Sequence, residues 1–272
     1  MNPFLPLLTT LLPVIYALAA AAYARAYVRE GSAGDRIGPV ALWAAVLVHV
    51  LYLSVRGFLE GHLPLASVYD FLSATGLSMA VVYLYVEARE GIRTTGVFVV
   101  PIVFLIQIVS SAYGRTGAEQ IPLRPIWFEL HTLTAVLGYS AFAVSAIYGA
   151  LFLALYHEIK ANRFSLFFRR MPPLEVLGQM NIRAVGSGVV LLALAIGLGM
   201  GWLERSGQGS LSDPKIWLTI FVWCVFAFGL LAYHRFGWRG PRAIYMSLVA
   251  FTTLLLSRVV VDLFLHSFHT FR

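Results

Sequence analysis

The sequence predicts an all-α membrane protein, a polytopic bundle of about eight transmembrane helices. Hydrophobic residues make up 59% of the 272 residues and charged residues only 12%, whereas soluble domains carry about a quarter charged residues. Mean hydropathy is +0.79. Apolar runs near the roughly 20 residues that a spanning helix needs follow one another with short connections. We therefore expect a single membrane domain over residues 1–272.

The first half of the chain contains four predicted spans. The first begins without basic residues and is too long for the apolar core of a signal peptide, so we expect a retained helix. The second has His49 as a polar interruption, and the fourth is short and contains Pro101, which predicts a kink. The four spans cover about residues 4–26, 38–57, 67–87 and 96–113.

The second half contains four more spans, at about residues 130–157, 183–203, 215–235 and 243–266. The fifth span is long enough to protrude from the bilayer on one side. The loop 158–182 contains FSLFFRRMPP beside basic residues, and is either an interfacial amphipathic helix or a plain connector. Loops 114–129 and 204–214 are rich in turn-forming residues, which predicts irregular structure.

Charge predicts the orientation of the spans. Most of the 20 lysines and arginines lie in the loops after spans one, three, five and seven. The positive-inside rule places those loops in the cytoplasm and both termini on the outer side of the cytoplasmic (inner) membrane. The same bias explains the formal net charge of +7, so the bilayer is the predicted partner and nucleic acid is not.

Several classes of chemistry lack their sequence signals. Cys224 is the only cysteine, which excludes an intrachain disulfide and CxxC thiol chemistry within one chain. No HExxH motif or paired Cys/His cluster favours zinc, and no Walker motif favours nucleotide binding.

The seven histidines are the candidate functional residues, because polar groups near the bilayer interior are costly. His131 opens the fifth span and His269 closes the eighth, so both are expected at the outer side. Two imidazoles at one height on different helices suit a bis-histidine haem site, and Trp127 is placed to flank a porphyrin. The alternative for each histidine is an interfacial side chain with a solvated tip. His266, three residues before His269, is a substitute ligand or a hydrogen-bonding neighbour.

A second pair, His49 and His234, is predicted in or near the inner half of the membrane. For His49 the alternative to haem ligation is a neutral core imidazole that hydrogen-bonds to a neighbouring helix. For His234, which precedes Arg235, the alternative is a cation favoured by the helix dipole and the anionic leaflet. We expect His157 to be solvated and His62 to shape a loop.

Three stretches are similar to a known family. The run from His49 to Glu60, followed by GHLPLASVYDFL (61–72), is similar to its segment RW-x-x-x-GHFPLSNLYESL. WFELHTLTAVLGYSAFAVSAIYG (127–149) is similar to its segment H-x-x-x-x-x-x-x-Y-x-x-F. The tail from Asp213 is similar to a third family segment through DPKIW, LLAYH, GWRGPRA and FHTF. The family's segment ends in L-H-S-Y. From about residue 45 onward the chain resembles the cytochrome c assembly family, which includes CcsA-type and HemX-type proteins.

The resemblance implies a haem-binding membrane core. It places His131 and His269 on the two external haem ligands and His234 on the membrane histidine, with His49 as its partner. Trp127 and Asp213 belong to the matching motifs and are expected in the cofactor-binding region. The CcsA-type segment W-x-W-D-P-K reads Ser-Leu-Ser-Asp-Pro-Lys at 210–215. The loss of both tryptophans favours the HemX-like branch.

The predicted function is therefore haem handling. We expect non-covalent haem b, one molecule or two, bound or transferred in cytochrome c biogenesis, with no catalysed reaction assigned. As a subunit of a haem–cytochrome c ligation complex, the chain would need apocytochrome c or a periplasmic partner protein. The alternatives are a HemX-like regulator that binds a cytosolic haem-synthesis enzyme (glutamyl-tRNA reductase) through loop 158–182, and a transmembrane electron carrier.

Overall fold

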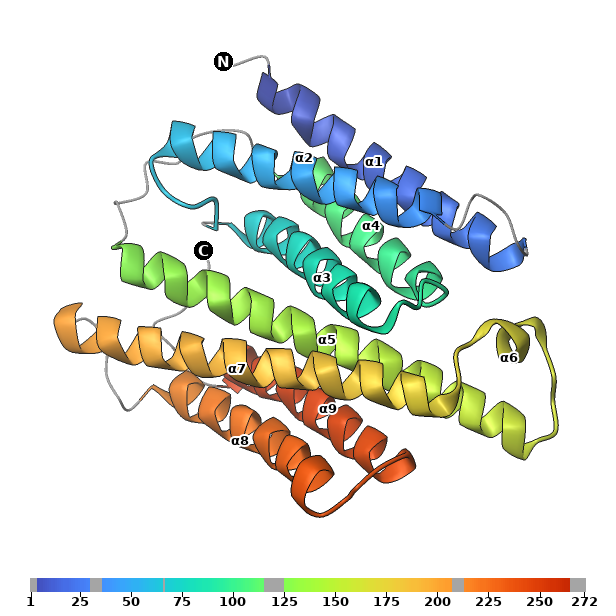
Figure 1. Ribbon diagram of the computed structural model, residues 1–272. Helices are drawn as coiled ribbons and strands as arrows, with labels where there is room; N and C mark the ends of the chain where they lie inside the picture. Colours follow the sequence, from blue (N-terminus) through green and yellow to red (C-terminus); the bar gives the residue numbers. More distant parts are fainter. Residues whose placement is uncertain (1–3, 30–35, 66, 115–124, 207–212, 265–272) are drawn as a thin grey trace. The chain divides into compact units, whose positions relative to one another are not determined.

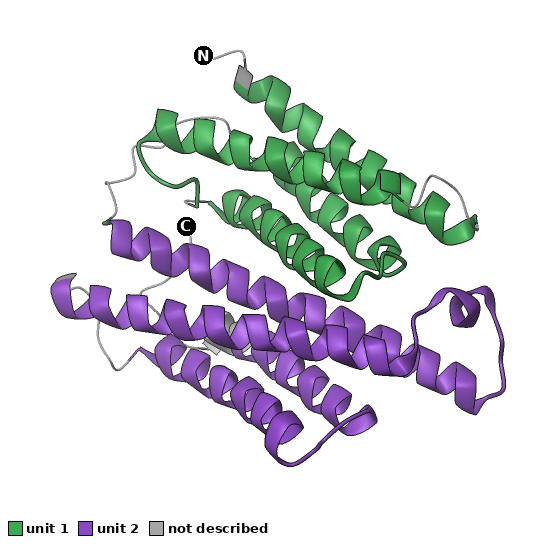
Figure 2. Ribbon diagram, in the orientation of Figure 1, with its two compact units in different colours: residues 1–125 green, residues 126–272 purple. Residues whose placement is uncertain are grey.

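The computed structural model describes residues 4–29, 36–65, 67–114, 125–206 and 213–264. Within these ranges the chain is helical and contains no strand, which confirms the predicted fold class. Each of the eight predicted spans coincides with a helix, and seven of the described helices are long and apolar enough to cross a membrane. The last helix has a shorter apolar stretch, Pro241–Ser257. The chain forms two compact units, residues 1–125 and 126–272 (Figure 2).

Unit 1 contains α1 (Phe4–Val28), α2 (Ile37–Glu60), α3 (Val68–Glu90) and α4 (Gly96–Tyr113) (Figure 1). Helix α1 packs against α2 and α4, and α3 packs against the same two helices. The described part of unit 1 is therefore a four-helix bundle, and α4 continues through Pro101.

Unit 2 is built on two long helices, α5 (Ile126–Lys160) and α7 (Leu174–Ser206), which pack along each other. Helices α8 (Pro214–Arg235) and α9 (Pro241–Phe264) close this second bundle, α8 against α7 and α9 against α5. Phe142 of α5 and Phe226 of α8 stack in its core with their ring centroids 3.6 Å apart.

The predicted start of the sixth span at residue 183 is wrong by more than two turns, because α7 begins at Leu174. Polar residues lower the hydropathy of these first turns, but tertiary contacts hold them. The buried Asn181 amide donates to the Ser145 carbonyl at 2.7 Å and to Ser247 Oγ at 3.0 Å. These bonds tie α7 to α5 and α9. What is left of the predicted loop contains only the five-residue helix α6 (Leu166–Arg170).

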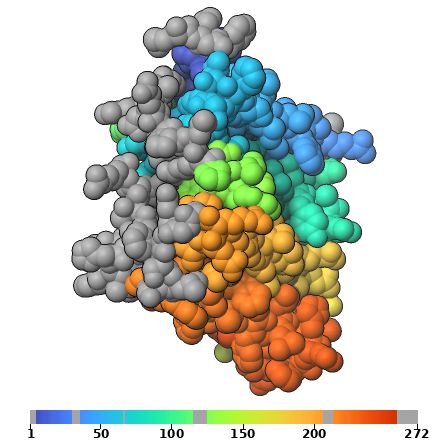
Figure 3. Space-filling view, turned by 90° about the vertical axis from the view of Figure 1, so that its left-hand side faces the viewer, coloured from blue at the N-terminus to red at the C-terminus, as the bar shows by residue number. Residues whose placement is uncertain are grey.

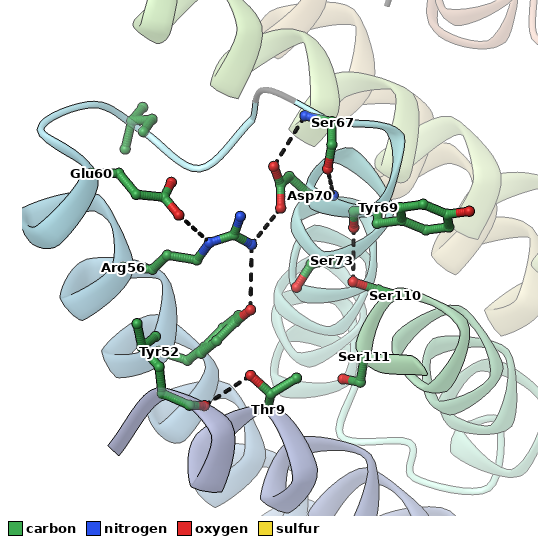
Figure 4. Close-up of polar contacts among 12 residues, drawn as sticks. Thr9, Tyr52, Arg56, Glu60, Ser67, Tyr69, Asp70, Ser73, Ser110 and Ser111 are labelled. Carbon is green, nitrogen blue, oxygen red and sulfur yellow. Dashed lines mark hydrogen bonds and ion pairs between the residues drawn. The ribbon is translucent and has the colours of Figure 1, made fainter. Parts of the chain in front are cut away.

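The connection between α2 and α3 is held by a buried ion pair (Figure 4). Helix α2 ends at Gly61, whose φ of 74° is left-handed and favours glycine. Ser67 and Asp70 form a reciprocal capping box at the start of α3. The Arg56 guanidinium bonds to Asp70 and, at 2.7 Å, to Glu60. The motif at 61–72 therefore has a structural role, since its residues close this turn.

Candidate functional site

The start of α5 and the end of α7 bring His131 against the backbone of α7. On the face shown in Figure 3, the light green surface of the first turns of α5 lies beside the orange surface of the last turns of α7. His131 Nδ1 lies 2.7 Å from the carbonyl oxygen of Ala195. Since a carbonyl oxygen only accepts, Nδ1 carries the hydrogen, and in the neutral imidazole Nε2 then keeps its lone pair. No residue in the described part of the chain hydrogen-bonds to Nε2.

This arrangement suits a metal ligand. Metal-binding histidines commonly donate their second ring N–H to a carbonyl or carboxylate, which sets the tautomer and the ring orientation. The Ala195 carbonyl does this for His131, so that Nε2 is the free coordinating atom. Iron in a porphyrin accepts such a neutral imidazole as an axial ligand. The chemistry of His131 therefore fits haem.

Gly199 makes the approach of His131 possible. A Cβ atom at this position would lie 2.7 Å from Nδ1 and 2.8 Å from Cε1 of the imidazole. A Cβ at Gly197 or Gly201, on the same helix, would meet nothing within 4 Å. Of these three glycines, only Gly199 is required by a neighbouring side chain.

Aromatic rings continue from His131 toward the end of α7. Phe128 lies 6.4 Å from His131 and 5.3 Å from Trp202, measured between ring centroids. Trp127, predicted to flank the cofactor, is 42% exposed and carries the Arg205 guanidinium 4.6 Å above its ring centre. His269 and His266 lie outside the described residues, so the second external ligand stays a prediction.

Asp213 has a clear local role. Its buried side chain accepts a hydrogen bond from the backbone N–H of Lys215 at 2.8 Å and so caps α8, with Pro214 in the first helical turn. Its predicted place in the cofactor region stays a prediction.

His49 lies at the centre of a buried hydrogen-bond chain in unit 1. Ser73 donates its hydroxyl hydrogen to Gln107 Oε1 at 3.2 Å, so Ser73 Oγ accepts from His49 Nε2, 2.9 Å away. His49 Nδ1 then accepts from the Tyr16 hydroxyl at 3.0 Å. Both ring nitrogens are thus paired, and His49 is fully buried. Ligation of iron by His49 would have to displace one of these partners.

His234 is exposed in the last turn of α8, with its ring edge-on to Tyr233 at 5.1 Å between centroids. It belongs to unit 2 and His49 to unit 1, and their pairing stays a prediction. His157 is exposed, as expected, with Nδ1 bonded to the Leu153 carbonyl. In His62, Nδ1 lies 2.9 Å from the Leu63 carbonyl within the α2–α3 connection.

Comparison with known proteins decides the family. The family model described as "Cytochrome C assembly protein" matches residues 65–269, which is most of the chain. The chain belongs to the cytochrome c assembly family. The match confirms the predicted resemblance, and together with the apolar helices it makes the chain a multi-pass membrane protein.

Individual members of the cytochrome c assembly family are similar over most of their length. "Cytochrome c biogenesis protein CcsA" of Guillardia theta is 23% identical over 248 residues, 84% of this chain and 82% of the relative. The protein of the same name from Heterosigma akashiwo is 25% identical over 237 residues, 74% of each chain. "Protein HemX" of Brevibacillus brevis is 26% identical over 227 residues, 80% of each chain.

Reasoning from the sequence missed the residues that position the histidines of this cytochrome c assembly protein. Ala195 and Gly199 orient His131, but a backbone carbonyl has no signature in the sequence. The three alternating glycines at 197–201 were the available signal. Ser73 and Gln107 serve His49 and could have been noticed as polar residues inside apolar spans.

Proposed function

We propose that this protein binds haem b non-covalently at the end of unit 2 where α5 begins, with His131 as one axial ligand and His269 as the other. The observation that supports this best is the hydrogen bond from His131 Nδ1 to Ala195, which leaves Nε2 free to coordinate. Cys224 is the only cysteine, so thioether attachment at a CxxCH motif does not apply.

His266 competes with His269 for the second ligand position. Leu265–Phe268 reads LHSF, which agrees with the family pattern L-H-S-Y at three positions, and His269 follows in FHTF. The two histidines are only three residues apart in the sequence, so each is a candidate partner of His131. The variants His266→Ala and His269→Ala are therefore compared side by side.

The test is an optical spectrum of the purified protein, oxidised and reduced, with added hemin. We expect a six-coordinate low-spin haem that acid–acetone extracts. His131→Ala should lower the haem content or convert the haem to a high-spin form. His157→Ala is the matched control, because His157 lies on the same helix and also pairs Nδ1 with a carbonyl, that of Leu153. A colourless protein that ignores hemin, or an unchanged spectrum in His131→Ala, contradicts the proposal.

We propose haem transport or haem handling for cytochrome c biogenesis as the biological role. The similarity to proteins named CcsA and HemX supports this. The loss of both tryptophans before Asp213 favours the HemX-like branch over haem presentation to apocytochrome c. Co-purification of a periplasmic partner protein would favour the ligation complex instead. Binding of a cytosolic haem-synthesis enzyme would favour the regulator, provided that neutralising the basic residues between α5 and α7 abolishes it.

We also propose a second haem, held between His49 and His234. If the two residues share one iron, His49→Ala and His234→Ala should remove the same spectral component, and the double variant should lose no more than either single variant. Two haems would also make a transmembrane electron carrier possible. Additive losses would leave His49 as the centre of the hydrogen-bond chain in unit 1.

A further inference from the structure

We propose that Trp202, Arg205 and Lys215 form a carboxylate-binding corner beside His131, which holds the propionate groups of the porphyrin. This inference rests on the proposed haem site and names the residues that recognise the edge of the ligand. All three residues belong to unit 2, two at the end of α7 and one at the start of α8.

Trp202 supplies an unused hydrogen-bond donor. Its indole Nε1 is buried and has no hydrogen-bond partner in the described part of the chain. An indole N–H only donates, and a buried donor without an acceptor is costly, above all in a membrane protein. The ring is held edge-on against Phe128, which in turn contacts His131. The Trp202 ring is therefore part of the surroundings of His131. Its free N–H needs an acceptor, which the bound porphyrin would supply.

Arg205 supplies a planar cation. Its guanidinium lies over the ring of Trp127, 4.6 Å from the ring centre. No described carboxylate forms an ion pair with it. A guanidinium held over an aromatic face keeps N–H groups available for a further partner. A carboxylate is the group that such an edge binds in a bidentate manner.

Lys215 adds a second positive charge. It is close enough to interact electrostatically with the His131 ring. As the second residue of α8, it lies at the positive end of the helix dipole, where a cation is unfavourable.

The spacing agrees with the shape of the ligand. With iron on His131 Nε2, the carboxylates lie at the periphery of the porphyrin and not at its centre. Arg205 is six residues beyond Gly199, which is about 9 Å along a helix. The donors are therefore displaced from the imidazole toward the helix end, as the carboxylates are displaced from the iron.

The experiment compares hemin with hemin dimethyl ester, whose carboxylates are blocked. Each is titrated into the full-length, haem-free protein in detergent and followed by absorbance. We expect the ester to bind about 100-fold more weakly than hemin, because it loses charge-assisted hydrogen bonds from two donors, each equivalent to about 10-fold. Trp202→Phe, which removes the N–H together with part of the ring, and Arg205→Gln should each weaken hemin by about 10-fold and weaken the ester less, because the ester oxygens carry no charge.

Two control variants remove the same groups elsewhere in unit 2. Trp223→Phe removes an indole N–H that donates to the Val189 carbonyl at 2.9 Å. Arg239→Gln removes a guanidinium that lies 5.6 Å above the ring of Tyr233. Both should keep the preference for hemin over the ester. If Trp202→Phe does not fold, the exposed Arg205 still provides the test, with Arg205→Lys expected to keep part of the preference.

The outcomes separate the two proposals. Equal binding of hemin and ester by the unaltered protein, or variants that weaken both ligands equally, would overturn the carboxylate-binding corner. If His131→Ala still lowers hemin binding in that case, the haem site itself stands. If hemin does not bind, or His131→Ala has no effect, the proposed function falls and the corner with it.

Discussion

Replacing Gly199 with alanine should weaken haem binding without unfolding the protein. The new Cβ atom would lie 2.7 Å from His131 Nδ1 and 2.8 Å from Cε1, closer than nonbonded atoms come, so the imidazole has to move. Its hydrogen bond to the Ala195 carbonyl is 2.7 Å long and breaks when the ring swings away. The hydrogen bond that favours the tautomer with a hydrogen on Nδ1 and a free Nε2 is then lost.

The size of the effect follows from opposing contributions. Losing the hydrogen-bond partner of a metal-binding histidine typically lowers metal affinity about 10- to 100-fold. Alanine stabilises a helix by about 1 kcal/mol relative to glycine, and overpacking costs about 1–3 kcal/mol. The two stability effects offset each other in part and leave a net cost of about 0–2 kcal/mol, whereas nothing offsets the loss of affinity. We therefore expect a large change in hemin binding and a small change in the melting temperature.

The assay is a hemin titration followed by absorbance, beside thermal unfolding in the same detergent. Gly197→Ala and Gly201→Ala are the controls, because a Cβ at either position meets nothing within 4 Å. Both should bind hemin as tightly as the unaltered protein and melt slightly higher. If Gly199→Ala binds hemin as the controls do, the argument that Ala195 and Gly199 position His131 is refuted.

Three further predictions concern stability and topology. Asp70→Asn should destabilise unit 1 by about 3 kcal/mol, because it leaves the buried Arg56 guanidinium only partly paired. Glu60 is the less buried partner of Arg56, so Glu60→Gln should cost less, and an equal loss would contradict this. Asn181→Leu should lower stability by about 1–3 kcal/mol although it makes the core more apolar, since it breaks two buried hydrogen bonds; an unchanged or raised melting temperature would argue against those bonds. A reporter active only in the cytoplasm, fused to the C-terminus, should stay silent, and a strong signal would invert the proposed topology.

The helices could be predicted because the hydropathy of a segment depends only on the residues within that segment. An apolar run of spanning length has few alternatives to a helix in a bilayer, where every backbone polar group needs an internal partner. The prediction failed at the start of α7 because a hydropathy criterion leaves segments with polar residues out of a predicted span. There Asn181 is stable in the helix through its bonds to Ser145 and Ser247, which lie 36 residues earlier and 66 residues later.

The candidate site could be predicted only in part. His131 could be singled out as a polar residue at a membrane edge within a family motif. His49 could be singled out in the same way, yet its environment differs. Both of its nitrogens are paired in unit 1, whereas His131 keeps one free. Two histidines that look alike in the sequence are thus distinguished by their hydrogen-bond partners.

By itself the sequence determined the fold class, the order of the spans, the family and the candidate histidines, because each of these depends on composition or on short local patterns. Only the tertiary structure decided which nitrogen of His131 is free, since its partner, the Ala195 carbonyl, lies 64 residues later in the chain. It also decided that Gly199 rather than Gly197 or Gly201 has to be small. Hydrogen bonds and steric contacts act over about 3 Å, and only the packing of α5 against α7 brings these groups that close.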